Sequence, residues 1–208
     1  MANGATLFES ICSNFSDSPP DEVCTSCVCV PSAASAPSGG PFSSILHKAQ
    51  VILGLSSGRL AVIADEVNPD KGRQNCGFII DAVKSRLMGK DSKAIAPVPR
   101  SSAGLELTDG SWSDIEVRFN STFQDNVGFE NAFKNVHDGG HGTMGLIKII
   151  RPDGSAHVAM IANNHGSVAI IEGQGGGFIS SSANAATKQY NADGNNSIGF
   201  AQLPEKFK

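Results

Sequence analysis

Cys76 occupies a position at which a cysteine can act as a nucleophile. It follows the polar, turn-prone segment 68–72 and precedes apolar residues at steps of three and four, which predict a helix over 78–87 that Gly89 ends. The first turn of a helix favours an anion, because its backbone N–H groups are unpaired and the macrodipole is positive there. The thiolate is such an anion and is the reactive form of cysteine. The alternative is a buried cysteine that serves only as a small apolar side chain.

His157 is the candidate base for that nucleophile. It interrupts the apolar segment 156–162, which we expect to be the middle strand of an antiparallel meander with outer strands at 143–150 and 168–172. A hairpin turn is expected at 163–166, where asparagine and glycine gather. The histidine therefore lies on a strand that pairs with the next segment of the chain.

The register of this hairpin decides which side chain faces His157. A two-residue turn sets it opposite Glu172 or Gln174, depending on the position of the turn, and a three-residue turn sets it between them, opposite Gly173. Cross-strand neighbours come within about 5 Å, so every register places a hydrogen-bonding side chain beside the imidazole. Such a side chain fixes the tautomer of a histidine that takes a proton from a thiol. A structural histidine satisfied by Glu172 is the alternative.

The order of these parts predicts the fold class. Cysteine at a helix start, histidine on a strand, and Glu or Gln on the next strand is the papain-like order. We therefore expect an α+β fold in which a helical part with the nucleophile packs on an antiparallel sheet with the histidine. His141 competes for the role of base, since its glycine-rich loop at 139–142 could line a cleft. His137 and His165 fall in turn regions, where we expect them to meet solvent.

The 208 residues suffice for one domain with a core of its own. Residues 1–44 are rich in Ser, Pro, Ala and Gly, which predicts an arm or peripheral layer, and residues 45–208 are expected to form the catalytic domain. Further helices are expected at 45–55 and 60–67, and a last short strand at 198–201. The segment 115–133 carries a mixture of apolar periods and is not assigned to helix or strand, and the polar tail 180–194 is expected to be a loop.

Composition excludes several classes of function. The net charge of −4, without a Lys/Arg cluster, argues against a nucleic-acid binder. No apolar run has the length of a membrane span, and the N-terminus lacks the pattern of a signal peptide. We therefore expect a protein that leaves its cell, if at all, without a cleaved signal peptide.

Four of the five cysteines lie in the first thirty residues. Three of them are spaced like half of a zinc site, but no second ligand pair follows at the expected distance, so no metal or cofactor is expected. Disulfides in an exported state are one alternative, and reduced small apolar residues are another. These cysteines are Cys12, Cys24, Cys27 and Cys29.

Beyond these patterns, the chain resembles the papain-fold toxin domains, the glutamine deamidases of bacterial polymorphic toxin and secreted-effector systems. The resemblance begins with Asn75 and Cys76 at a helix start and covers about residues 70–178. The family continues with a Gly-rich strand entry, a Gly-His-Val strand and a strand that ends in Asp-Gly-Gln. Here the matching stretches are 142–147, 156–163 and 168–174. Glu172 replaces the family's Asp, which leaves open whether Glu172 or Gln174 orients the imidazole, and Ala156 replaces a Gly.

The resemblance implies a reaction. The Cys76 thiolate would attack the side-chain amide of a glutamine in a target protein, with His157 as base and acid and Glu172 as the group that holds the ring. The oxyanion would meet the Cys76 backbone N–H and the side chain of Gln74 or Asn75. Asparagine also has an ordinary role here, as a helix cap.

The same residues allow other activities. A cysteine protease, a peptidoglycan amidase and a transamidase use such a triad, and a catalytically inert papain-like module would only bind a partner. The resemblance implies a secreted effector that acts in a target cell, with the cytoplasm as the expected place. It also implies a target-cell protein as substrate and a cognate immunity protein as partner.

Overall fold

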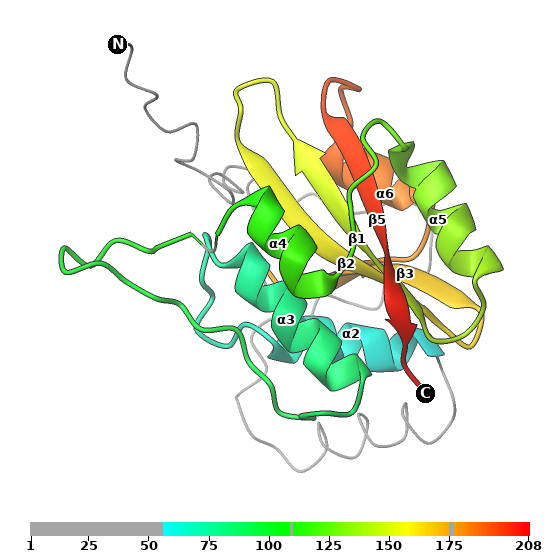
Figure 1. Cartoon of the computed structure of the whole chain (residues 1–208), viewed down its shortest axis with the longest axis horizontal. Helices are drawn as coiled ribbons and strands as arrows, with labels where there is room; N and C mark the ends of the chain where they lie inside the picture. The colour runs from blue at the N-terminus through cyan, green and yellow to red at the C-terminus, as the bar shows by residue number, and fades with distance from the viewer. Residues whose placement is uncertain (1–55, 109, 175–176) are drawn as a thin grey trace, which may run out of the picture.

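The computed structural model describes residues 56–108, 110–174 and 177–208 (Figure 1). The expected arm at 1–44, the expected helix at 45–55 and the four N-terminal cysteines lie outside the described residues. The division into an arm and a catalytic domain therefore stays a prediction.

A five-stranded antiparallel sheet forms the centre of the described fold, with the strand order β4-β3-β2-β1-β5. The expected meander is confirmed, and the last strand is longer than expected because it continues along the edge of the sheet beside β1. The strands are β1 Thr143–Ile150, β2 Ala156–Asn164, β3 Ser167–Glu172, β4 Phe178–Ser180 and β5 Ser197–Lys206.

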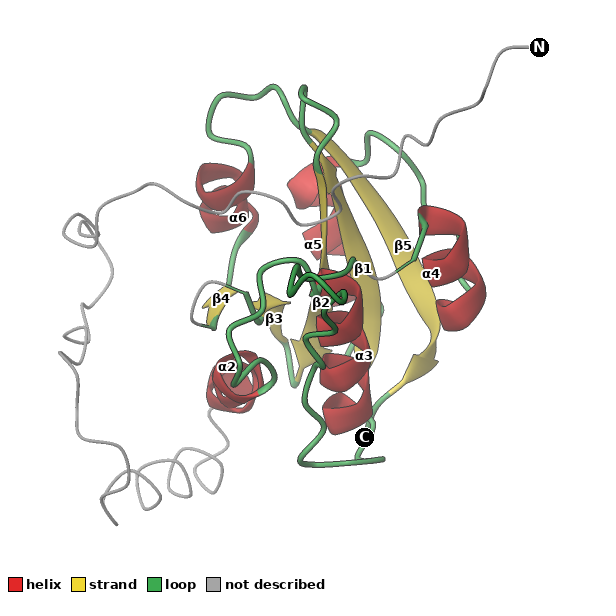
Figure 2. Ribbon diagram, turned by 90° about the vertical axis from the view of Figure 1, so that its left-hand side faces the viewer, coloured by secondary structure: helices red, strands yellow, loops and turns green. Residues whose placement is uncertain are grey.

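The helices pack on both faces of this sheet. α2 (Ser56–Glu66), α3 (Cys76–Leu87) and α4 (Trp112–Phe119) contribute to one buried apolar cluster, and α5 (Gly128–Asp138) and α6 (Ala183–Tyr190) contribute to the other. Figure 2 shows these helices in red around the yellow strands. The α+β class is confirmed, and α6 occupies part of the tail that was expected to be a loop.

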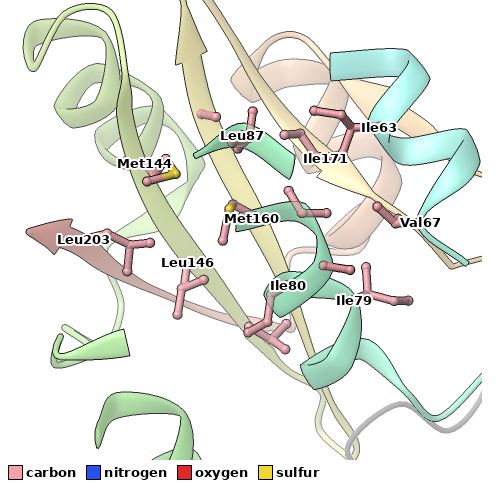
Figure 3. Packing of buried hydrophobic residues seen from close by; sticks show 14 of the residues in the cluster. Ile63, Val67, Ile79, Ile80, Leu87, Met144, Leu146, Met160, Ile171 and Leu203 are labelled. Atoms are coloured by element: carbon pink, nitrogen blue, oxygen red, sulfur yellow. The ribbon is translucent and has the colours of Figure 1, made fainter. Parts of the chain in front are cut away.

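The helix that carries Cys76 is held firmly against the sheet. Ile80 and Leu87 of α3 pack in one cluster with Leu146 of β1 and with Met160 and Ile171 of β2 and β3 (Figure 3). Burial of one such side chain contributes about 1.5–3 kcal/mol to folding. Because several residues of α3 are buried in this way, the first turn of the helix has a defined position relative to the strands.

Candidate active site

Cys76 is the first residue of α3, as the sequence predicts. Asn75 precedes it at the cap position, but its side chain makes no capping hydrogen bond. The first turn carries no acidic residue, and the last turn carries Lys84 and Arg86. Arg118 of α4 adds a positive group beside this turn, with Nη2 donating to the Gly77 carbonyl at 3.4 Å. Arg118 Nε also pairs with Asp81 Oδ2 at 3.4 Å, so its charge is shared with a carboxylate of α3. The start of the helix favours an anion at the sulfur, whereas burial in an apolar cluster disfavours one.

The sulfur itself is neither exposed nor reduced in this structure. Cys76 is 1% exposed within the apolar cluster of α2 and α3, and it is part of a disulfide. The other four cysteines of the sequence lie outside the described residues. Since only a thiolate is nucleophilic, any chemistry at Cys76 requires that the disulfide first be reduced.

His157 and Glu172 form a direct buried pair. His157 Nε2 lies 2.5 Å from Glu172 Oε2, and the two residues are 1% and 2% exposed. A carboxylate only accepts hydrogen bonds, so the hydrogen of this contact belongs to Nε2 of a neutral ring or of an imidazolium. In the neutral ring this tautomer leaves the lone pair on Nδ1, the atom that can take a proton.

The hairpin register is the one that sets His157 opposite Gln174, yet the histidine contacts Glu172. The paired positions of β2 and β3 sum to 331, from Asn164 with Ser167 to Met160 with Ile171, where the ladder ends. Beyond that point the strands no longer pair, and the Glu172 side chain reaches the ring diagonally. The Gln174 backbone N–H donates to Glu172 Oε1 at 2.8 Å. Gln174 thus supports the carboxylate and does not replace it.

Tyr190 completes this cluster and was missed from the sequence. Its hydroxyl donates to Glu172 Oε2 at 3.1 Å, and its ring stacks on His157 with centroids 6.2 Å apart. Burial raises the pKa of Tyr190 well above its usual value, and the neighbouring Glu172 carboxylate adds to the shift. The hydroxyl therefore stays a donor. A helix signal was present in the sequence, because Ser182 caps an alanine-rich run that ends at Tyr190.

The sheet separates the two halves of the predicted triad. Cys76 belongs to the cluster of α2 and α3. His157 lies opposite Ile149, which belongs to the other cluster, as does Tyr190. Directly opposed residues point to the same face of a sheet, so the His157 ring lies on the face of α5 and α6. Cys76 and the His157 ring therefore lie on opposite faces of the sheet.

The two halves come close in space at Gly173. Gly173 follows Glu172, and a Cβ atom at Gly173 would lie 2.7 Å from Ile79 Cγ2 and 2.6 Å from Val67 Cγ2. Ile79 stands one turn after Cys76. The end of β3 therefore touches the first turns of α3 at the point where β2 and β3 have stopped pairing.

The two oxyanion candidates differ. Asn75 Nδ2 donates to Asn68 Oδ1 and to the Pro97 carbonyl, each at 3.1 Å, so both amide hydrogens are engaged. The expectation that Asn75 donates to an oxyanion is corrected on this ground, and so is its expected role as a side-chain cap. Gln74 is half-buried, and its backbone N–H donates to Glu106 Oε2 at 3.0 Å. Gln74 stays a candidate.

The competing histidine lies elsewhere. The His141 ring stacks on His165 at 3.7 Å, beside the β2–β3 turn. The His165 N–H donates to His141 Nδ1 at 3.1 Å. This turn is at the opposite end of β2 from His157, so His141 does not join the His157 cluster. Within the described ranges, no three His, Cys, Asp or Glu side chains gather in a way that could hold a metal ion.

Comparison with known proteins identifies a family. The family model described as papain fold toxin 1, glutamine deamidase, matches residues 74–177, which is half of the chain. The match includes Cys76, His157 and Glu172. No curated protein matches the chain. In the part of the chain that the structure describes, no helix has the length and apolar character needed to cross a membrane.

One solved structure is similar, the crystal structure of the Pseudomonas avirulence protein AvrPphB. The identity is 14%, and the alignment covers 39% of this chain and 50% of that one, with a TM-score of 0.28. The matched part thus spans half the length of that protein. A likeness this weak adds nothing to the family match.

Proposed function

Because the chain belongs to the papain-fold toxin family of glutamine deamidases, we propose that it deamidates a glutamine of a target-cell protein with Cys76, His157 and Glu172. The observation that carries the proposal is the buried contact between His157 Nε2 and Glu172 Oε2, at 2.5 Å, within the matched region. It gives the imidazole the tautomer that a thiol-dependent amidohydrolase requires.

The first half of the reaction would form a thioester. His157 Nδ1 takes the proton of the reduced Cys76 thiol, and the sulfur attacks the side-chain amide carbon of the glutamine. The amide oxygen becomes an oxyanion, for which the Cys76 backbone N–H and the Gln74 side chain are the candidate donors. The C–N bond then breaks, and the imidazolium returns the proton to the departing ammonia.

The second half would release the product. Water attacks the thioester carbon while His157 takes one of its protons, and the C–S bond breaks. The sulfur recovers its proton, and a glutamate stands where the glutamine was. The balance is one water consumed and one ammonia released for each glutamine, with no oxidant or cofactor.

The proposal requires the sulfur and the imidazole to meet at the end of the sheet. The β2–β3 ladder stops at Met160 and Ile171, and Gly173 lies against Ile79 there. The two strands no longer pair beside His157, and the proposal places the contact between the ring and the first turn of α3 at this end of the sheet. Reduction of the disulfide at Cys76 would precede the approach of substrate.

The family match also supports a role outside the producing cell. A toxin domain of this family implies a protein target, and we propose secretion without a cleaved signal peptide and action in the cytoplasm of the target cell. That compartment is reducing in most cells, which suits an enzyme that needs the Cys76 thiol. A cognate immunity protein in the producing cell is the expected partner.

A catalytically inert binding module is the second candidate. The burial of Cys76, its disulfide and the placement of His157 on the other face of the sheet favour it. Such a module would keep the fold and the His157–Glu172 pair as structure alone. It would bind its partner equally well with alanine at position 76.

One experiment separates these candidates. The reduced protein and its Cys76→Ala variant are incubated with a lysate of the target cells, and the proteins are then analysed by peptide mass spectrometry. We expect conversion of glutamine to glutamate at defined sites with the wild type and none with the variant. Cleaved chains in place of converted glutamines would indicate a peptidase. Identical peptide maps for both proteins would overturn the proposal that the chain is an enzyme.

A further inference from the structure

Asn68 is a buried side chain, 6% exposed, between α2 and α3, and its amide makes four hydrogen bonds. Oδ1 accepts from the Gly72 N–H at 3.0 Å and from Asn75 Nδ2 at 3.1 Å. Nδ2 donates to the Gly72 carbonyl at 3.0 Å and to the Gly173 carbonyl at 3.1 Å. The backbone partners fix the orientation of the amide, because an N–H only donates and a carbonyl only accepts.

These bonds join the two halves of the proposed site. Asn75 directly precedes Cys76, and Gly173 directly follows Glu172. One side chain therefore spans from the residue before the nucleophile to the residue after the carboxylate. The Gly173 backbone also lies tightly against Val67 and Ile79, where a Cβ atom would not fit. Packing of this density leaves little freedom for the junction to shift.

We propose that Asn68 is a positioning residue that sets the separation between Cys76 and the His157–Glu172 pair. The proposal rests on the deamidation proposed above. Asn68 acts through Asn75 on one side and through Gly173 on the other, without contact to the reacting atoms. Positioning matters because attack on an amide needs the reacting atoms in near-attack geometry, and a misplacement of about 1 Å can reduce the rate by roughly 100-fold.

The variant Asn68→Asp tests this role selectively. It keeps an oxygen that accepts from Gly72 and Asn75, and it loses the donor bonds to the two carbonyls, including that of Gly173. Asn163→Asp is the matched control. Asn163 is equally buried, with Nδ2 donating to the Val136 and His137 carbonyls at 3.2 and 3.3 Å and Oδ1 accepting from Gly166 at 2.8 Å. It makes the same kind of bonds near the β2–β3 turn, away from His157.

Two readouts are measured on the reduced full chain. The first is ammonia release from an acetylated, amidated peptide with a single glutamine. The second is the pH dependence of iodoacetamide alkylation of Cys76, resolved by peptide mass spectrometry. We expect Asn68→Asp to lower kcat by roughly 100-fold with little change in KM, and to move Cys76 alkylation toward the pH range of an ordinary thiol. Asn163→Asp should match the wild type in both. Equal behaviour of the two variants would overturn the proposal.

The failure of one proposal is distinguishable from that of the other. If the wild type converts neither lysate proteins nor the peptide, deamidation fails, whereas a shifted alkylation profile in Asn68→Asp still supports positioning. If Asn68→Asp does not fold, Gly173→Ala tests the same separation, because its Cβ pushes β3 away from Ile79 while the carbonyl bond remains possible. An unchanged alkylation profile and kcat in a folded Gly173→Ala protein would contradict the positioning role.

Discussion

The Tyr190 hydroxyl lies 3.1 Å from Glu172 Oε2, the same oxygen that the His157 ring contacts at 2.5 Å. The other oxygen, Oε1, accepts from the Gln174 backbone N–H at 2.8 Å. A buried carboxylate needs such donors, because removal of a charge from water without compensation is costly. Together these bonds hold the Glu172 carboxylate, and through it the imidazole, in one orientation.

From this arrangement we propose that Glu172, and not Gln174, orients the imidazole. We expect Glu172→Ala to lower kcat/KM for deamidation by about 100-fold, because the imidazole loses the partner that fixes its tautomer. Gln174→Ala should stay close to the wild type, since Gln174 contributes to this cluster through its backbone N–H. Initial rates of ammonia release measure both. A larger loss in Gln174→Ala than in Glu172→Ala would reverse the assignment.

The raised pKa of Tyr190 predicts an alkaline titration that can be observed directly. Tyr190 is the single tyrosine of the chain, so tyrosinate absorbance reports on this residue alone. Burial, together with Glu172, raises its pKa well above the usual value of 10.0. We expect no tyrosinate in the native protein near that pH, and ordinary titration in the urea-unfolded protein.

The same shift gives the sign of a stability change. A pKa that is higher in the folded state contributes stability that is fully present below pH 10.0 and is lost as pH rises through the folded value. Tyr190→Phe should remove this part of the alkaline loss, as seen in chemical unfolding measured on both sides of pH 10.0. If Tyr190 of the native protein titrates over the same pH range as in the unfolded protein, its hydroxyl is not buried against Glu172 as described.

Glu106 holds the chain just before Cys76, the proposed nucleophile. Its Oε2 accepts from the backbone N–H groups of Arg73 and Gln74, at 2.7 and 3.0 Å. We expect Glu106→Ala to lower kcat about tenfold through a looser Gln74, and Glu106→Gln to restore most of the rate because it keeps an acceptor oxygen. Glu116→Ala is the control. Glu116 lies on α4 and accepts from the Phe123 N–H at 2.8 Å, so it makes a similar bond to the backbone without contact to Gln74. An equal loss in both alanine variants would point to general destabilisation.

The disulfide at Cys76 predicts a requirement for reduction. The oxidised protein should release no ammonia, because a sulfur in a disulfide is not a thiolate. Dithiothreitol should switch activity on, and its removal with an oxidant should switch activity off. Activity that is the same before and after reduction would show that Cys76 is not the nucleophile.

The sequence was sufficient to predict those helices and strands whose apolar residues follow one clear pattern. The apolar steps after Cys76 predicted α3, and the short apolar segments on either side of the turns at Pro152 and His165 predicted the three central strands, which are buried almost throughout. The segment 115–133 did not resolve because it contains the end of α4, a loop and the start of α5, so no single period runs through it. Val117 of α4 is also 81% exposed, which breaks the apolar pattern of that helix. The polar residues of α6 gave no apolar period, so Tyr190 was missed.

Only part of the candidate site could be predicted from the sequence, because the rest depends on contacts between distant parts of the chain. His157 and its partner followed from strand pairing, but the choice between Glu172 and Gln174 depended on where the β2–β3 ladder ends, and pairing rules do not give that point. The face of the sheet that each residue occupies depended on the packing of α5 and α6. Asn75 could not be recognised as a structural amide before its partners, Asn68 and Pro97, were known.

The reaction of Cys76 with iodoacetamide tests the central claim most directly, because it needs no substrate. Alkylation is followed by peptide mass spectrometry against pH in the reduced wild type and in His157→Gln. If the sulfur and the imidazole form a pair, Cys76 of the wild type reacts at a pH well below the value of about 8.5 typical of a free thiol, and the variant loses this low-pH reactivity. The same pH profile in both proteins, or an unreactive Cys76 in both, would contradict the account.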